Sequence, residues 1–583
     1  MKKYLRPGLA VGSGALLALC FPPFNLGWIV WGWMWILLPL LWTSRSEKKR
    51  RAGFGIGFLS GLGFWLINLK WIWTVTGLGA VTMALYLAIY FGIFGAFAAN
   101  SANPWRKEVK VATDIPARFR EMWRSLGYAA MLGSWWCGME WIRGWMLTGF
   151  GWNGLGVAFH NNLIMAQNAE FVGVYGLSFL PVFFSAVAVQ VGRRFYLQAK
   201  EQSVKLLHWD FATAMLVIMG SFTVGSVRFS HAGSGEQIEA KVLLAQQNIP
   251  QTAGKVEWPR EEILGGFTDL VSGALADLDA QTHADLKATS AEGSETTVLI
   301  RKPDWVIWPE ATLVDRFFTL EDGSRVPETM TLSDLLDDIR EMGDFTFIAG
   351  ANEVEGYVEG RYVHRVEHGR YWNSMITLDS ERNLETYRKH HLVIFGELIP
   401  DVLYLRELYA KVAGVPFIDS FSSGESHEPL DLKVGEETVQ AIPSICFEDT
   451  VGRLTRKSVR ADPQVIVNIT NDGWFKQSEG AAQHFANARF RCIELRRPMV
   501  RCANSGVGGV ISVTGSTLDP FTREDRRLVD DSGSHFTKGT LFASVWIPRE
   551  PGFTLYALWG DWFAVVGLAL SFLAGTALRL RKS

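Results

Sequence analysis

Long apolar runs lie at both ends of this chain of 583 residues, and they enclose a block of different composition. The runs occupy residues 1–235 and 550–583, whereas residues 236–549 alternate short apolar stretches with charged ones. An α-helix needs about 20 predominantly apolar residues to cross a bilayer. Because one hydrophobic core does not grow to this chain length, the pattern predicts transmembrane helices on both sides of an inserted water-soluble domain.

Hydropathy predicts eight transmembrane helices, seven before the inserted domain and one after it. They are expected at about 8–20, 28–43, 53–69, 82–100, 126–142, 171–192, 208–228 and 555–578. With the N-terminus in the cytoplasm, 21 Lys and Arg residues fall on the inner side, and only Lys70 and Arg143 fall in the outer loops. We therefore expect both termini in the cytoplasm and the inserted domain on the extracytoplasmic side.

Charge and cysteine spacing exclude several classes of protein. The block 236–549 carries 49 of the 59 acidic residues and no basic stripe, which argues against nucleic acid as a partner. The five cysteines have neither the spacing of a metal site nor that of a disulfide framework, so we expect no metal and no cofactor. They are Cys20, Cys137, Cys446, Cys492 and Cys502.

Two charged residues lie in the predicted fifth transmembrane helix and at its outer end. Glu140 and Arg143, in WCGMEWIRGW, are one helical turn apart. Charges at that depth are costly, which favours a function such as holding a lipid headgroup. They are equally compatible with an i,i+3 pair that only positions the helix. Both interpretations stay open at the level of sequence.

The inserted domain alternates strand-like and helix-like segments, which predicts an α/β sandwich. The strands are expected within 241–249, 304–310, 344–354, 374–379, 439–448, 463–472 and 509–515. The helices are expected within 261–281, 331–342, 449–459 and 481–497, and residues 283–297 are expected to form a polar loop.

Three residues with complementary chemistry follow strand-like runs of this domain. They are Glu310 in DWVIWPEAT, Lys389 in TYRKHHLVIFGE and Cys446 in VQAIPSICFEDT. A carboxylate, an ammonium and a thiol provide the base, the oxyanion stabiliser and the nucleophile of thiol-based acyl transfer. Taken singly, Glu310 is more simply a helix cap, Lys389 a solvated lysine and Cys446 a core thiol. Their occurrence together favours catalysis.

The surroundings of Cys446 strengthen this interpretation. A buried-looking strand leads directly into Cys446, and a helix is expected to begin at about Asp449. The positive end of such a helix favours the thiolate. The backbone N–H of Phe447 is then placed as in a nucleophile elbow, where it points at a developing oxyanion.

Several motifs together resemble the nitrilase superfamily. They are WPE at 308–310, YRKHHLVIFGE at 387–397, CFE at 446–448 and the segment 470–511 that begins TNDGWFKQSEG. With seven spans before the domain and one after it, the chain resembles, more narrowly, the apolipoprotein N-acyltransferase family. This resemblance covers essentially the whole chain.

The resemblance implies a fold and a set of site residues. The fold is a nitrilase-like αββα sandwich inserted in an eight-helix transmembrane bundle. Glu310 would be the general base, Lys389 the oxyanion-stabilising cation and Cys446 the nucleophile. Other positions match the family's pocket: Glu397 and Glu448 as acidic residues, and more loosely Asn373, Trp258 and Arg406. Two positions depart from the family's pattern, because Ile394 replaces a proline and Phe447 replaces a tyrosine.

The resemblance also implies an activity. It is the transfer of an acyl chain from a membrane phospholipid, through a thioester on the cysteine, to the N-terminal amino group of diacylglyceryl-cysteine in apolipoproteins. The expected location is the bacterial inner membrane, with the catalytic domain on the periplasmic side. The expected domain boundaries are 1–235, 236–549 and 550–583, and the protein is expected to be a monomer. Two alternatives stay open: a membrane-anchored amidase that hydrolyses a small amide, and a transporter or receptor without enzymatic activity.

Overall fold

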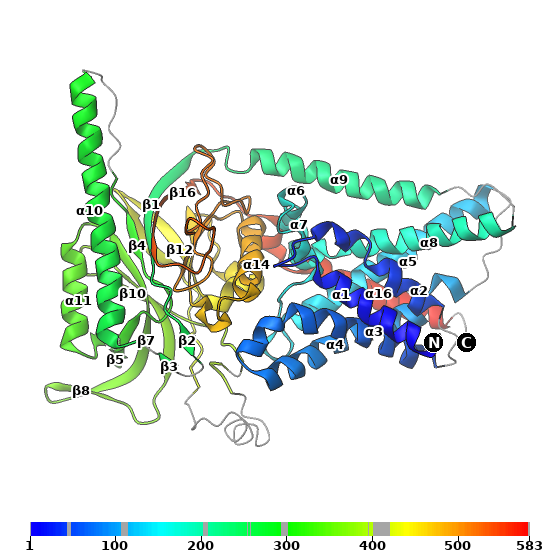
Figure 1. Cartoon of the computed structure of the whole chain (residues 1–583), viewed down its shortest axis with the longest axis horizontal. Helices are drawn as coiled ribbons and strands as arrows, with labels where there is room; N and C mark the ends of the chain where they lie inside the picture. Colours follow the sequence, from blue (N-terminus) through cyan, green and yellow to red (C-terminus); the bar gives the residue numbers. More distant parts are fainter. Residues whose placement is uncertain are drawn as a thin grey trace. The chain divides into compact units, whose positions relative to one another are not determined.

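The computed structural model describes residues 2–43, 48–106, 115–201, 208–252, 255–256, 258–292, 301–394, 396–399 and 420–580. The chain divides into two compact units (Figure 1). Unit 1 comprises Met1–Ala232, Ser478–Leu495 and Phe553–Ser583. Unit 2 comprises Gly233–Gln477 and Arg496–Gly552.

The regular secondary structure of unit 1 is helical in the residues that the structure describes. Its α-helices are α1 (Lys2–Ala18), α2 (Met34–Trp42), α3 (Lys49–Asn68), α4 (Gly77–Asn100), α5 (Ile115–Arg143), α6 (Leu163–Ala166), α7 (Ala169–Leu177), α8 (Phe179–Glu201), α9 (Trp209–His231), α14 (Glu479–Leu495), α15 (Leu555–Trp559) and α16 (Trp562–Leu580). Short 3-10 helices connect several of them, among them Gly27–Trp31 and Leu155–Phe159.

Each of the eight segments expected to cross the membrane contains helix, but fewer helices meet the requirements of a span. Within the described residues, Gly77–Arg106 and Trp209–His231 are long and apolar enough to cross a bilayer. A third span results if Ala169–Leu177 and Phe179–Lys200, which are bent by 58° at their junction, are counted together. The arrangement of eight spans therefore stays a prediction.

Small residues allow α3 and α4 to pack closely. A Cβ atom on Gly57 would lie 2.2 Å from the carbonyl oxygen of Phe91, and one on Gly95 would lie 2.3 Å from that of Gly53. Close backbone approach at small residues is typical of helix packing in membranes, where dispersion contacts replace the hydrophobic effect.

Unit 2 is built on two β-sheets. Its strands are β1 (Gln237–Gln246), β2 (Gln251–Thr252), β3 (Lys255–Val256), β4 (Trp305–Ile307), β5 (Leu313–Thr319), β6 (Arg325–Pro327), β7 (Thr346–Glu359), β8 (Tyr362–Arg365), β9 (Tyr371–Leu378), β10 (Leu384–Arg388), β11 (Leu430–Val434), β12 (Glu437–Ile445), β13 (Gln464–Thr470), β14 (Met499–Ala503), β15 (Gly509–Ile511) and β16 (Gly539–Pro548).

In the part of the chain that the structure describes, the first sheet has nine strands in the order β10-β9-β7-β4-β1-β16, with β5, β6 and β8 beside this path. The second has the order β11-β12-β13-β14-β15, and a separate pair joins β2 to β3. Parallel pairing joins β1 to β4, β4 to β7, β12 to β13 and β13 to β14. Parallel strands send their carboxyl ends to one edge of a sheet.

The two sheets pack face to face over a common apolar core. Leu244 and Ile307 of the first sheet and Ile445 and Val467 of the second are fully or almost fully buried in it. The other face of the first sheet is covered by α10 (Arg260–Glu292) and α11 (Met330–Glu341), as Figure 1 shows. The predicted α/β sandwich is confirmed, because unit 2 contributes two sheets and a helix layer on the first of them.

Three features of the sequence prediction differ from the structure. Residues 283–292 are not a loop, because α10 continues to Glu292. The segment after Cys446 does not form one regular helix, because it is divided into the 3-10 helix Cys446–Thr450, α13 (Gly452–Thr455) and a further 3-10 turn, Arg456–Ser458. The helix α14, expected in the inserted domain, belongs by its packing to unit 1.

Candidate active site

The ends of three strands of unit 2 carry the predicted chemical groups. Glu310 lies three residues after β4, Lys389 directly follows β10, and Cys446 directly follows β12. The N–H of Lys389 donates to the carbonyl oxygen of Asn373 at 2.8 Å, which continues the pairing of β10 with β9. Secondary structure therefore fixes the backbone at each of these positions.

Lys389 is buried between two carboxylates. Its Nζ donates to Glu310 Oε1 at 3.3 Å and to Glu397 Oε1 at 2.8 Å, and only 1% of its side chain is exposed. Asn373 Nδ2 donates to the same two oxygens, at 2.8 Å and 3.1 Å. Among the described residues, Glu310 Oε2 makes no hydrogen bond, so this oxygen is left to accept a proton.

The two carboxylates keep Lys389 charged. Burial alone would lower the pKa of the ammonium, but the negative charges of Glu310 and Glu397 outweigh burial and hold the pKa of Lys389 well above its ordinary value. Lys389 is therefore a fixed cation throughout the physiological pH range. A fixed, desolvated cation is suited to stabilise an oxyanion and is not suited to act as a base.

Cys446 occupies a strained backbone position. Its φ angle is +54°, in the left-handed region that residues other than glycine rarely adopt. It begins the 3-10 helix Cys446–Thr450, and the side chain of Asn468 donates to its carbonyl oxygen at 3.2 Å. Such a sharp turn after a strand is the geometry of a nucleophile elbow. The thiol is half-buried, whereas the other four cysteines are buried.

The predicted helix effect on Cys446 is wrong in direction. Burial raises the pKa of the Cys446 thiol, the negative charge of Glu310 raises it further, and Lys389 lowers it only in part. A five-residue 3-10 helix has too few aligned peptides to offset burial. The resting side chain is therefore a thiol, and Glu310 and Lys389 act on it in opposite directions.

Gly350 gives Glu310 its place beside β7. A Cβ atom at Gly350 would lie 2.4 Å from the N of Ala311 and 2.6 Å from the Cα of Glu310. Real Cβ atoms do not approach backbone atoms this closely, so a side chain at this strand position would displace the turn that carries the carboxylate. The glycine is thus required by close packing at the site.

Two family comparisons match separate parts of the chain. Residues 13–187 match the family described as apolipoprotein N-acyltransferase N-terminal domain. Residues 294–547, which include Glu310, Lys389 and Cys446, match the family described as carbon-nitrogen hydrolase. The chain belongs to the apolipoprotein N-acyltransferase family.

Relatives with this name are similar along nearly their whole length. The apolipoprotein N-acyltransferase of Photobacterium profundum is 26% identical over 578 residues, which cover 95% of this chain and 91% of that protein. The one from Bradyrhizobium diazoefficiens is 28% identical over 591 residues, which cover 98% and 95%. This member of the apolipoprotein N-acyltransferase family is thus an enzyme of the nitrilase superfamily and a membrane protein with two or three candidate spans.

Glu448 connects two of the strand ends that carry the candidate site. Its carboxylate accepts the N–H groups of His390 and His391, at 2.7 Å and 2.9 Å, and that of Ile445 at 2.8 Å. The hydroxyl of Tyr387 donates to both of its oxygens, at 3.2 Å and 3.1 Å. Burial raises the pKa of Glu448 to about 7, although these backbone donors lower it. Glu448 therefore fixes the chain beside Lys389 to the chain beside Cys446.

A buried arginine that the sequence analysis missed supports the turn of Cys446. Arg501 on β14 pairs with Asp449 at 3.2 Å and with Asp472 at 3.1 Å, and all three side chains are fully buried. Asp449 belongs to the 3-10 helix of Cys446, and Asp472 follows β13. The acidic residue in TNDGW and the arginine in MVRCAN were visible in the sequence, but nothing in their spacing predicts that they pair.

The remaining predicted residues lie elsewhere or outside the described residues. The ring of Phe447 stacks on His391, with centroids 5.6 Å apart. Trp258 packs against the apolar core on the helix-covered face of the first sheet, and it makes no hydrogen bond with the Glu-Lys-Cys group in the described structure. Arg406 lies outside the described residues. Ile394 lies in a turn closed by a 2.7 Å hydrogen bond from Glu397 N to the carbonyl oxygen of Val393.

Across the described ranges, no group of three or more His, Cys, Asp or Glu side chains is arranged to hold a metal ion. His390 and His427 stack at 4.1 Å, and Lys457 Nζ lies 3.2 Å from His427 Nε2.

Proposed function

We propose that this chain transfers an acyl group from a membrane phospholipid to the N-terminal amino group of diacylglyceryl-cysteine in an apolipoprotein, through a thioester on Cys446. One observation carries the proposal: a buried ammonium lies between Glu310 and Glu397, and Lys389 and Glu310 both act electrostatically on the half-buried thiol. The names of the full-length relatives support the choice of substrates.

In the first half-reaction, Glu310 Oε2 takes the proton of the Cys446 thiol. The sulfur attacks the ester carbonyl carbon of the phospholipid, and the electrons of the C=O bond move to an oxyanion. Lys389 and the backbone N–H of Phe447 stabilise this charge. When the intermediate collapses, the ester C–O bond breaks, and the proton passes from Glu310 to the leaving oxygen. A lysophospholipid leaves, and Cys446 carries the acyl group.

In the second half-reaction, the amino group of the acceptor attacks the thioester carbonyl. Glu310 takes a proton from the attacking nitrogen, and the C–S bond breaks with return of a proton to sulfur. The products are an amide and the free thiol. Because the lysophospholipid leaves before the acceptor reacts, the kinetics are expected to be ping-pong.

The other polar residues position these groups in the proposal. Glu397 and Asn373 hold Lys389 and Glu310 in a fixed geometry through shared hydrogen bonds. Glu448 connects the two chain segments that carry Lys389 and Cys446. A geometry fixed before the reaction lowers the cost of reorganisation in the transition state.

The location of the domains is part of the same proposal. Spans within 1–235 and 550–583 would hold a catalytic domain of residues 236–549 against the outer leaflet of the inner membrane, with both termini in the cytoplasm. The basic residues of the predicted inner loops support this orientation. Both substrates are lipid-anchored, so confinement to one leaflet raises their effective concentration.

A transfer assay tests the proposal. Purified enzyme in detergent micelles receives phospholipid labelled in its acyl chain and a synthetic diacylated lipopeptide with a free amino terminus. We expect label in amide linkage on the lipopeptide, and none with Cys446→Ala. Release of the label as free fatty acid with the lipopeptide left unmodified would indicate a hydrolase. No cleavage of phospholipid at all would favour a transporter or receptor.

A further inference from the structure

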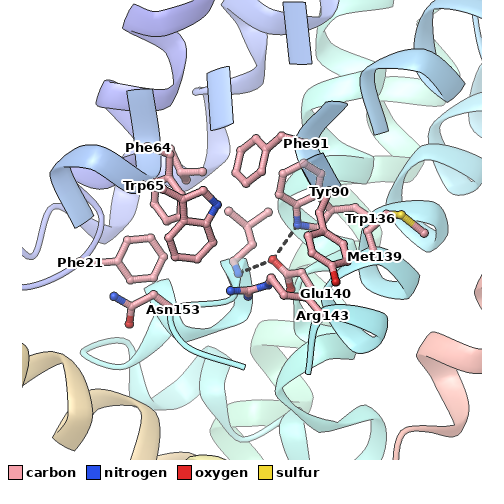
Figure 2. A pocket seen from close by; sticks show the side chains of 12 residues that line it. Phe21, Phe64, Trp65, Tyr90, Phe91, Trp136, Met139, Glu140, Arg143 and Asn153 are labelled. Carbon is pink, nitrogen blue, oxygen red and sulfur yellow. Dashed lines mark hydrogen bonds between the residues drawn. The ribbon is translucent and has the colours of Figure 1, made fainter. Parts of the chain in front are cut away.

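Glu140, whose role the sequence left open, holds other parts of unit 1 together (Figure 2). Its Oε1 accepts Trp136 Nε1 at 2.8 Å and the backbone N–H of Leu155 at 2.7 Å, and its Oε2 accepts the hydroxyl of Ser178 at 2.6 Å. The cavity beside it has room for about one water molecule. The hydrogen bonds of Glu140 are thus directed to the protein, and its role is structural.

A buried hydroxyl in unit 2 lies next to the candidate nucleophile. Thr470 ends β13, the strand that pairs in parallel with β12. Ile445 lies opposite Ile469, so the next residue of each strand brings Cys446 beside Thr470. Asn468 of the same strand donates to the carbonyl oxygen of Cys446 at 3.2 Å, which keeps the two segments in contact past their last paired residues. Thr470 is fully buried, so its hydroxyl is available to the protein and not to solvent.

The Thr470 hydroxyl has two acceptors within reach. It donates to Asp472 Oδ1 at 3.3 Å, which is long for a hydroxyl bonded to a carboxylate. A hydrogen bond from the Thr470 side chain to Cys446 also lowers the pKa of the thiol. Because a hydroxyl has a single O–H donor, it serves one of these acceptors at a time. The long bond to Asp472 is the weaker one once the sulfur carries a charge.

Asp472 remains hydrogen-bonded when Thr470 turns away from it. Arg501 Nη1 donates to Asp472 Oδ2 at 3.1 Å, and Arg501 Nη2 donates to Asp472 Oδ1 at 3.4 Å. Arg501 itself is held by Asp449 at 3.2 Å and by the carbonyl oxygen of Val507 at 2.7 Å. Both oxygens of Asp472 therefore keep a charged donor, and rotation of the Thr470 hydroxyl leaves no carboxylate oxygen unpaired.

The charged groups that act on the Cys446 sulfur have other partners in the proposed reaction. Glu310 and Asp472 raise the pKa of the thiol, and Lys389 lowers it. In the proposed reaction Glu310 takes the thiol proton, and Lys389 stabilises the oxyanion of the substrate. Thr470 is then a neutral donor whose hydrogen bond can be given to the sulfur.

We propose that Thr470 is a further catalytic residue, whose hydroxyl turns from Asp472 to the Cys446 sulfur each time this sulfur becomes a thiolate. The inference rests on the proposed thioester chemistry. When the C–S bond breaks in the second half-reaction, its electron pair stays on sulfur, and Thr470 donates a hydrogen bond to it. The proton that Glu310 took from the attacking nitrogen then passes to the sulfur, and the hydroxyl returns to Asp472. Because hydrogen bonds to ionised acceptors are about twice as strong as neutral ones, Thr470 stabilises the thiolate more than the thioester.

Alkylation of Cys446 by iodoacetamide in the purified full chain tests this inference. Thr470→Val keeps the branched shape of the side chain and removes the hydroxyl. We expect the pH midpoint of alkylation to rise by about one pH unit, because the thiolate loses a hydrogen bond to a charged group. Thr470→Ser keeps the hydroxyl and should retain the parent midpoint. Mass spectrometry of the Cys446 peptide measures the midpoint in each variant.

A second measurement follows the thiolate as a leaving group. Enzyme that has been acylated on Cys446 with labelled phospholipid receives the diacylated lipopeptide, and the loss of label from the enzyme is followed in a single turnover. Thr470→Val should slow this step about tenfold, and Thr470→Ser should stay close to the parent rate.

The matched control is Thr282→Val. Thr282 is also a buried threonine of unit 2, and its hydroxyl donates to the carbonyl oxygen of Leu278 at 2.9 Å within α10. This helix covers the face of the first sheet that is turned away from the second sheet. Loss of the Thr282 hydroxyl should therefore change neither the midpoint nor the single-turnover rate.

An unchanged midpoint in a folded Thr470→Val variant would overturn the proposal, and so would an equal rise in Thr470→Ser or in Thr282→Val. If Thr470→Val does not fold, Thr470→Ala provides the same comparison with Thr470→Ser. A midpoint that rises in Thr470→Val, in a chain that forms no acyl-enzyme, would support the hydrogen bond to the thiolate and refute only the proposed acyl transfer.

Discussion

The Lys389 ammonium lies between the carboxylates of Glu310 and Glu397. Lys389 and Glu310 both affect the protonation of the Cys446 thiol. Burial raises the pKa of the Cys446 thiol, the charge of Glu310 raises it further and Lys389 lowers it only in part, so the resting thiol keeps its proton. In the proposed reaction, the negative charge that develops on the substrate oxygen would lie next to the Lys389 ammonium. In the proposed mechanism, the cation beside the resting thiol would therefore favour the transition state.

Removing the charge of Lys389 and removing the charge of Glu310 should shift the pH dependence of Cys446 alkylation in opposite directions. Lys389 lowers the pKa of the thiol and Glu310 raises it, so the pH midpoint of modification by iodoacetamide should rise in Lys389→Met and fall in Glu310→Gln. Mass spectrometry of the Cys446 peptide from neutral to alkaline pH measures both midpoints. Shifts of the same sign in the two variants would contradict the proposed arrangement.

The sequence indicated candidate site residues, but it did not indicate how their side chains contact one another. Glu310, Lys389 and Cys446 each follow an apolar strand in a recognisable motif, so their types and positions were readable. The sharing of Lys389 by Glu310 and Glu397 was not, because it depends on how β10 and the next turn pack beside β4. The sequence analysis also predicted the wrong direction for the shift of the Cys446 pKa, because burial raises this pKa more than a short helix lowers it.

At the scale of elements, the residues of the candidate site follow the carboxyl ends of strands, and neighbouring strands leave space for these residues and hold them in position. β7 provides room through Gly350, whose backbone lies against the turn of Glu310. β14 provides support through Arg501, which holds the segments after β12 and β13 together. Neither residue is expected to touch substrate.

Gly350→Ala should impair turnover by displacing Glu310. The added Cβ would meet the backbone of Ala311 at 2.4 Å, and a catalytic group moved by about 1 Å costs on the order of 100-fold in rate. The transfer assay measures the loss. Gly265→Ala on α10 is the matched control, because nothing lies within 4 Å of its added methyl group and activity should be retained. Full activity in Gly350→Ala would show that the turn is not constrained.

Arg501→Met should destabilise unit 2. Breaking a fully buried ion pair by removal of one partner costs about 3–5 kcal/mol in the free energy of unfolding. Arg527→Met removes a partly exposed pair with Asp525 and should cost less than about 1 kcal/mol. Denaturant unfolding monitored by fluorescence compares the two variants, and equal costs would contradict the structural role of Arg501.

The structure also explains why some elements were predicted incompletely. The first part of α10 was readable from its apolar spacing, but residues 283–292 are polar and helical, and their composition favoured a loop. The packing of α14 with unit 1 was equally hidden, because an apolar helix face does not identify its partner. Close packing at Gly57 and Gly95, in contrast, agrees with the glycine-rich sequence of α3 and α4.

For the whole molecule, successive segments of the chain alternate between the two compact units. Unit 1 collects three separate segments, and unit 2 collects two, so the chain passes between the units four times. A helix from the middle of the α/β block thereby becomes part of the helical unit. Folding of either unit requires contacts between residues far apart in sequence, which slows folding relative to a chain with local contacts.

The predicted orientation can be tested with single cysteines in a variant whose five native cysteines are replaced. Glu381→Cys on an exposed turn of unit 2 should react with a membrane-impermeant maleimide in intact spheroplasts. Arg50→Cys, exposed near the start of α3, should react only after the membrane is permeabilised. The reverse pattern would place unit 2 in the cytoplasm and contradict the orientation derived from basic residues.

The most direct test of the account is the chemical nature of the acyl adduct. Enzyme incubated with acyl-labelled phospholipid and no acceptor should carry label on the Cys446 peptide, and neutral hydroxylamine should release it. Subsequent addition of the diacylated lipopeptide should transfer the label to its amino terminus. Label on another residue, or stable label in Cys446→Ala, would contradict the central claim that this thiol carries the acyl group.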